Sequence, residues 1–288
     1  MQVSNSLKEK SFAYTGEKEN LEMRRDEIGE LMEIIAYCKN EAVSEPLVCQ
    51  DTLWETYVQD GVTFADWLYC REGDGSEEDR RRLMEALDKR EIVLSGPDGW
   101  SGEKAGMKEI PVALGEFPMC VAKVQDYIRK RRDILASIRD VREYEAFMQS
   151  CFTDSCFADG ILSEMKHIQN FSDKTREITD ALGILNDYAV DLYRQHSGHL
   201  EEAMDILSAL LRRKCAPDPA HAADLVFSFT YSEQLEGKNV AKVKDVECSS
   251  HLKLIHPGSN LRIYFYWCDK DIGAGEQVLV GRIGRHPY

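Results

Sequence analysis

The pattern of hydrophobic and polar positions changes near residue 216. Before that point, over residues 17–214, apolar residues recur at intervals of three and four, which is the period of amphipathic helices that bury one face. The clearest runs predict helices over residues 120–149, 174–194 and 200–214. Pro217 and Pro219 then end the helical pattern, because proline lacks the amide hydrogen that a helix interior needs.

After the prolines, apolar and polar residues alternate, as they do along a half-buried β-strand. Short turns separate the alternating segments, and this spacing is typical of an antiparallel meander. The predicted strands are residues 225–231, 251–256, 261–268 and 277–283. Earlier in the chain, a Gly- and Pro-rich stretch over residues 92–118 predicts a long loop or a short hairpin.

These patterns predict an α+β protein, with a mostly helical amino-terminal domain followed by a small antiparallel β-sheet domain. The first domain covers residues 1–216 and the second covers residues 217–288. A length of 288 residues accommodates two domains of ordinary size. The composition, 43% hydrophobic and 30% charged, is that of a globular protein and excludes a disordered chain.

Charge is distributed unevenly between the two parts of the chain. The net charge is -15, but residues 237–288 carry eight Lys or Arg against five Asp or Glu. An asymmetry of this kind indicates that the basic segment meets an anionic partner and that the acidic part covers or steers it. The other interpretation is that the two parts are simply solvated surfaces of different composition.

The sequence also bears on compartment and redox state. No apolar run approaches the roughly 18 residues that span a bilayer, and the first residues lack the apolar core of a signal peptide, so we expect a cytoplasmic protein without membrane partners. The nine cysteines are widely spread and form no C-x-x-C pair. They therefore predict reduced, buried side chains rather than disulfides or a zinc ribbon.

The candidate chemistry lies on one face of the predicted meander. Alternation over residues 261–268 directs Leu261, Ile263, Phe265 and Trp267 to the core, and Arg262, Tyr264 and Tyr266 to the other face. A turn at residues 257–260 then places His251 and Lys253 beside them. The last strand and the tail add Arg282, Arg285, His286 and Tyr288.

Such a set suits an RNA backbone. Lys and Arg neutralise phosphate, tyrosine rings stack on bases, and histidine transfers protons near neutral pH. We expect RNA binding and metal-independent cleavage, with His251, Lys253, Arg262, Tyr264, Tyr266, Arg282 and His286 as the candidate catalytic residues. The alternative is an ordinary solvated sheet face, on which cross-strand Tyr, Arg and Lys pairs hold the strands together.

Metal and cofactor chemistry have less support. Cys248 and His251 have C-x-x-H spacing, but zinc sites usually show two tight pairs and the sequence has only this one. The chain contains no P-loop, G-x-G-x-x-G, H-E-x-x-H or G-x-S-x-G motif. We therefore expect no metal and no cofactor.

The segments HLKL (251–254), LRIYFY (261–266) and VLVGRIGRHPY (278–288) resemble the end of a RelE/ParE-type toxin, over about residues 225–288. The resemblance implies a small twisted antiparallel sheet with helices on one side and mRNA cleavage by basic residues. Carried over by position, it implies roles for Lys253, Arg262, Arg282, His286 and Tyr288. ParE-like members act on a protein target instead, so the resemblance leaves both activities open.

The sequence thus favours a bacterial toxin-like or defence protein that binds RNA, free or on ribosomes, and cleaves it on the carboxy-terminal sheet. The acidic helical part would then be a built-in inhibitor or would recognise a protein partner. The alternative is a non-catalytic interaction module, in which the helices hold a partner protein and the sheet is a structural end cap.

Overall fold

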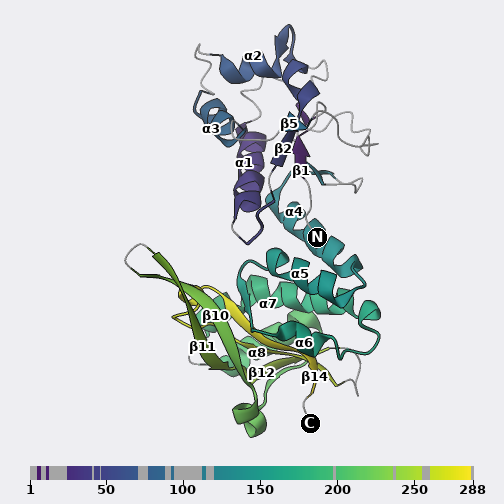
Figure 1. Ribbon diagram of the computed structural model, residues 1–288, viewed down its shortest axis with the longest axis vertical. Coiled ribbons are helices and arrows are strands. Elements are labelled where there is room, and N and C mark those ends of the chain that lie inside the picture. Colours follow the sequence, from purple (N-terminus) through teal and green to yellow (C-terminus); the bar gives the residue numbers. More distant parts are fainter. Residues whose placement is uncertain are drawn as a thin grey trace. The chain divides into compact units, whose positions relative to one another are not determined.

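The computed structural model (Figure 1) describes residues 5–7, 11–12, 25–40, 42–45, 47–70, 77–87, 92–93, 112–114, 120–196, 199–235, 238–254 and 260–286. The chain forms two compact units, an amino-terminal unit of residues 2–130 and a carboxy-terminal unit of residues 131–288. Both units combine helices with β-strands, which confirms the predicted α+β class.

The amino-terminal unit contains a mixed five-stranded sheet that the sequence did not predict. Its strand order is β5-β2-β1-β6-β7, with parallel β1–β2 and β2–β5 pairs and antiparallel β1–β6 and β6–β7 pairs. The strands are β1 (Asn5–Leu7), β2 (Leu47–Gln50), β5 (Ile92–Val93), β6 (Val112–Leu114) and β7 (Cys120–Val121). Strands of two to four residues are too short to show a period of two, which is why the pattern missed them.

Helices and a small hairpin complete this unit. They are α1 (Arg25–Lys39), the 3₁₀ helix η3 (Asp51–Glu55), β3 (Tyr57–Gln59), β4 (Val62–Thr63), α2 (Phe64–Tyr69) and α3 (Glu77–Leu87). Ile28, Leu31 and Ile35 of α1 are buried, as expected for residues spaced by three and four. Of the predicted loop at 92–118, the structure describes only β5 and β6, at its two ends.

The carboxy-terminal unit contains a second five-stranded sheet, of order β8-β14-β13-β12-β9. Its strands are β8 (Ser155–Phe157), β9 (Cys215–Pro217), β12 (Ser250–Lys253), β13 (Leu261–Tyr266) and β14 (Val278–Arg285). The β9–β12, β12–β13 and β13–β14 pairs are antiparallel, whereas β8 joins β14 in parallel. The predicted meander is therefore confirmed for β12, β13 and β14.

Helix α4 (Val124–Ser137) crosses the boundary between the two units. The carboxy-terminal unit also contains α5 (Val141–Cys151), α6 (Ile161–Met165), α7 (Thr175–Gln195) and α8 (Leu200–Leu211), with short 3₁₀ helices η4 (Phe171–Asp173), η5 (Pro219–Asp224) and η6 (Gly273–Gly275). The single helix predicted over 120–149 is wrong: it is divided into α4 and α5. Asp140 starts α5 by accepting hydrogen bonds from the amides of Arg142 and Glu143.

The division into units differs from the predicted one at residue 216. Strand β8 lies between α5 and α6 in the sequence and pairs with β14, and β9 follows α8 and pairs with β12. Helices α7 and α8 pack on β14 and β9 respectively. The helices from residue 131 onward therefore share one core with the sheet, whereas the alternation of residues, which is local, placed them in separate domains.

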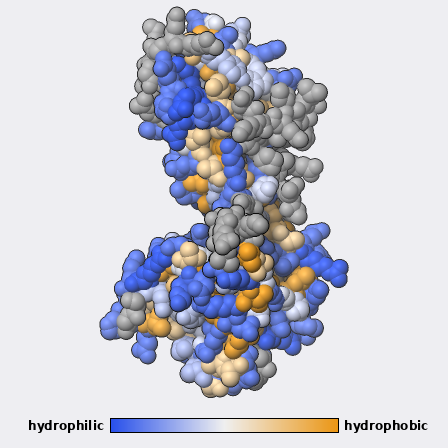
Figure 2. Space-filling view, turned by 60° about the vertical axis from the view of Figure 1, so that its left-hand side comes forward, coloured by the Kyte–Doolittle hydropathy of each residue, from blue (hydrophilic) through white to orange (hydrophobic). Residues whose placement is uncertain are grey.

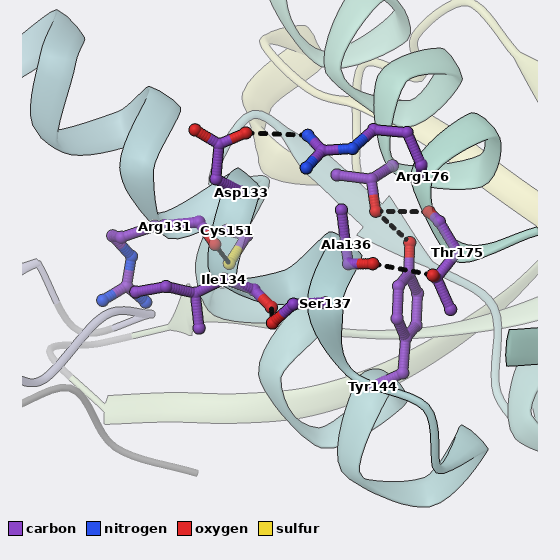
Figure 3. Close-up of polar contacts among 10 residues, drawn as sticks. Arg131, Asp133, Ile134, Ala136, Ser137, Tyr144, Cys151, Thr175 and Arg176 are labelled. Atoms are coloured by element: carbon purple, nitrogen blue, oxygen red, sulfur yellow. Dashed lines mark hydrogen bonds and ion pairs between the residues drawn. The ribbon is translucent and has the colours of Figure 1, made fainter. Parts of the chain in front are cut away.

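Polar contacts join α4, α5 and α7 beside this core (Figure 3). Arg131 of α4 is fully buried, and its guanidinium donates to the Ser150 hydroxyl of α5 at 2.8 Å. Thr175 of α7 donates to the carbonyl oxygen of Ala136 at 2.7 Å. The Tyr144 and Thr179 hydroxyls lie 2.8 Å apart. These contacts satisfy polar groups that would otherwise be costly to bury.

A long hairpin packs against the face of the carboxy-terminal sheet that carries Tyr264. It consists of β10 (Val226–Leu235) and β11 (Lys238–Glu247), which pair antiparallel with each other (Figure 1), and β11 was not predicted. Leu225, Phe229, Val246 and Cys248 pack with Tyr264 and Leu279 in one buried cluster. Tyr264 is 0% exposed and Arg262 is 7% exposed, so the alternative of a solvated sheet face is wrong for these residues.

Figure 2 shows hydrophobic residues as small groups among hydrophilic ones on the face in view. Among the helices that the structure describes, none combines the length and the apolar character needed to cross a bilayer.

Candidate functional site

Strand pairing brings several of the predicted residues onto one face. In the antiparallel register, His251 lies opposite Tyr264, and Lys253 lies opposite Arg262. Across the next pair, Tyr264 lies opposite Arg282. Directly opposed residues project to the same side of a sheet, so the five side chains share the face that the hairpin partly covers.

Asp218 and His221 extend this set, and the sequence did not identify either of them. Asp218 follows β9 directly, and its backbone amide donates to the carbonyl oxygen of Ser249 at 2.8 Å. Its Oδ1 lies 2.9 Å from Nδ1 of His221, and its Oδ2 lies 3.7 Å from Nε2 of His286. The two imidazole rings are 6.1 Å apart and nearly perpendicular. One carboxylate therefore lies between two histidines.

The rings of His251 and Tyr264 lie deeper in the unit, beneath His286. The His251 ring lies 5.3 Å from the Tyr264 ring, which in turn lies 6.4 Å from the His286 ring. We call Asp218, His221, His251, Arg262, Tyr264 and His286 the site cluster. His251 is 6% exposed. The side chains of His221 and His286 are 38% and 23% exposed, so the site cluster meets solvent at those two rings.

The buried polar atoms of the site cluster that make no hydrogen bond with any residue that the structure describes include Oδ2 of Asp218, Nδ1 of His251 and the hydroxyl of Tyr264. A buried polar group without a partner costs roughly 1–3 kcal/mol of stability. The site cluster is therefore a candidate site, at which a bound group would supply the missing partners.

The electrostatics of the site cluster keep its inner histidine neutral. Burial and, to a smaller extent, the Arg262 charge together lower the pKa of His251 to about 4. Burial, followed by the Arg262 charge, also lowers the pKa of His286. Burial and the nearby Asp218 carboxylate raise the pKa of Tyr264. At neutral pH, His286 therefore favours its proton-accepting form.

The other predicted residues lie outside the site cluster. Lys253 is half-buried next to Arg262, and its charge acts on both His251 and His286. Arg282 forms an ion pair with Glu164 of α6 at 2.8 Å. Tyr266 lies toward Tyr193 and Asp269, at the other end of β13. Tyr288, implied by the resemblance, lies outside the described residues.

Part of the missed site was visible in the sequence. Asp218 and His221 are three residues apart, directly after the proline that ends β9. That spacing allows the two side chains to meet in a 3₁₀ turn, where residues three apart lie on one side. The pair was missed because it lies between the last predicted helix, which ends at residue 214, and the first predicted strand, which begins at residue 225.

Among the described residues, no group of three or more His, Cys, Asp or Glu side chains is arranged to hold a metal ion. Comparisons of the chain with protein-family models, with curated proteins and with solved structures found no match.

Proposed function

We propose that the site cluster binds an RNA phosphodiester and cleaves it without a metal ion. The observation that carries this proposal is the Asp218 carboxylate between His221 and His286, with Arg262 beside them. Two histidines held by one carboxylate supply both a proton acceptor and a proton donor at one place. The resemblance of residues 225–288 to RelE/ParE-type toxins supports the same class of reaction.

The proposed step is an internal transfer on RNA. Neutral His286 accepts the proton of the ribose 2′-hydroxyl, and the 2′-oxygen attacks the adjacent phosphorus. The bond from phosphorus to the 5′-oxygen breaks, and His221 donates a proton to that oxygen. The products are a 2′,3′-cyclic phosphate and a 5′-hydroxyl end. The 2′-hydroxyl is the nucleophile, so the reaction needs neither an activated water nor a metal.

Cations support the charge that develops on phosphate. Arg262 is fixed in β13, where its Nη1 donates to the carbonyl oxygen of Leu261 at 3.0 Å. Lys253 lies opposite it on β12 and is more exposed. Preorganised positive charge of this kind stabilises the anionic transition state more than the ground state. Arg262 is as deeply buried as His251, so it acts on the phosphate through its charge and not by direct contact. His251 and Tyr264 also lie too deep to reach RNA, and they act by holding the outer rings.

The test is cleavage of a fluorescent RNA oligonucleotide by the full chain in EDTA. We expect cleavage that yields a 2′,3′-cyclic phosphate and that stops when the RNA carries a single 2′-deoxyribose at the cleaved position. His286→Ala and His221→Ala should each lower the rate by about 100-fold or more, the usual range for a general acid or base. His199→Ala, which changes an exposed histidine outside the site cluster, is the matched control.

Two results would overturn the proposal. One is cleavage that is unchanged in the His221→Ala/His286→Ala double variant. The other is a folded wild-type chain that cleaves no RNA, whether free or on ribosomes. The second result would favour the non-catalytic interaction module, in which the site cluster has only a structural role.

A further inference from the structure

A separate surface lies in the amino-terminal unit, between residues 51 and 70. The Trp54 ring of η3 and the Tyr69 ring at the end of α2 are stacked, with centroids 6.3 Å apart and planes inclined by 21°. Tyr69 is 52% exposed, and Trp54 is half-buried. Tyr57 of β3 adds a third aromatic side chain, 59% exposed, to the same stretch. Exposed large aromatic side chains in one short segment are characteristic of binding surfaces.

The stacked rings of Trp54 and Tyr69 are supported by buried aromatic residues of the core. Trp54 packs against Phe64 at 5.5 Å, and Phe64 packs against Phe12 at 4.5 Å in the core. Thr63 and Asp66 form a capping box that fixes the start of α2. The pair is therefore rigidly placed, and a partner would not have to order it on binding.

Acidic side chains accompany each ring. Asp51 precedes Trp54 by three residues in a 3₁₀ helix, so the two lie on the same side. Asp66 precedes Tyr69 by three residues in α2, which again places acid and ring on one side. Residues 51–70 contain four acids, Asp51, Glu55, Asp60 and Asp66, and no Lys or Arg. All four acids are exposed.

We propose that the Trp54–Tyr69 pair, with Asp51 and Asp66, is a docking surface for an arginine-bearing segment of a partner protein. A guanidinium group stacks on aromatic faces and pairs with carboxylates at the same time, which matches both features of this surface. The acids would repel RNA, so the surface is distinct in chemistry from the site cluster and does not depend on the proposed cleavage.

The test is fluorescence anisotropy of the full chain with a labelled peptide of alternating arginine and glycine. We expect saturable binding, roughly fivefold weaker binding of the lysine peptide, and loss of binding when citrulline, which has the shape of arginine without its charge, replaces arginine. Tyr69→Ser and Asp51→Asn should each weaken binding by about five- to thirtyfold, the range of one cation–π contact or charge pair. Tyr188→Ser, at an equally exposed tyrosine of α7, is the matched control.

Tyr69 and Asp51 are exposed, so both variants should melt at the wild-type temperature and cleave RNA as the wild type does. The proposal fails if the folded chain does not bind the arginine peptide. It also fails if Tyr69→Ser binds the peptide as tightly as wild type, or if the citrulline peptide binds equally well. A wild-type chain that binds the arginine peptide but does not cleave RNA would contradict the proposed function and leave the docking surface supported.

Discussion

Gly281 of β14 lies directly against the Phe227 ring of β10. A Cβ atom built on Gly281 would stand 2.4 Å from Cδ2 of Phe227 and 2.9 Å from Sγ of Cys248. The register between β13 and β14 shifts at this point, so Gly281 is the extra residue of a β-bulge. The missing side chain allows the hairpin to approach the sheet and to cover Tyr264.

We therefore expect Gly281→Ala to lower the free energy of unfolding by about 1–3 kcal/mol, because the added methyl group overpacks a closed interface. Urea unfolding followed by tryptophan fluorescence measures this change. Gly29→Ala is the control, since a Cβ there meets nothing within 4 Å and alanine favours a helix. Equal stability of Gly281→Ala and wild type would show that the hairpin does not pack this closely.

The hydrogen bond between Tyr144 and Thr179 supports a second prediction. Thr179→Val removes the hydroxyl and leaves the fully buried Tyr144 hydroxyl without that partner, at a cost of about 1–3 kcal/mol. Tyr144→Phe should cost less, because Thr179 still donates to the carbonyl oxygen of Thr175 at 2.7 Å. Thermal or urea unfolding of both variants measures which one loses more free energy of unfolding. A larger loss in Tyr144→Phe than in Thr179→Val would contradict it.

Burial of His251 predicts a pH dependence of stability. The pKa of His251 in the folded chain is about 4, below the value of about 6.5 for an unfolded histidine. The unfolded state therefore binds the proton more readily, and stability falls as the pH drops from about 6.5 toward 4. We expect this part of the loss to be on the order of 3 kcal/mol and to be absent in His251→Asn. His199→Asn, at an exposed position, should follow the wild-type curve.

The fold was predictable where elements were long enough to show their period. Residues 174–194 and 200–214 were recognised as helices, and they form α7 and α8. Strand β13 was recognised from its alternation. The short strands of the amino-terminal sheet were not, and neither were β8 and β9, which join the carboxy-terminal sheet from distant parts of the chain. Local pattern carries no information about such distant pairing.

The site was predictable only in part, for the same reason. Alternation and one turn were enough to place His251, Arg262 and Tyr264 on one face. They could not show that β10 and β11 cover that face, because Phe227 and Gly281 meet only in the folded chain. They also missed Asp218, whose contact with His286 joins segments nearly seventy residues apart.

The last prediction concerns Arg262, whose positive charge lowers the pKa of both His251 and His286. Replacing it in Arg262→Gln removes that charge and should raise both pKa values, because the imidazolium form is no longer repelled. NMR titration of the imidazole protons of the full chain measures the pKa shifts without reference to activity.

The same change predicts a shift in the pH dependence of cleavage. If His286 is the proton acceptor, the acid limb of the cleavage rate against pH should move to higher pH as the pKa of His286 rises, since the ring must be neutral to act. The control is Lys130→Gln, in the amino-terminal unit, which should change neither the histidine pKa values nor the acid limb of the cleavage rate. An Arg262→Gln chain whose histidine pKa values match those of the wild type would show that Arg262 does not set the charge of the site cluster.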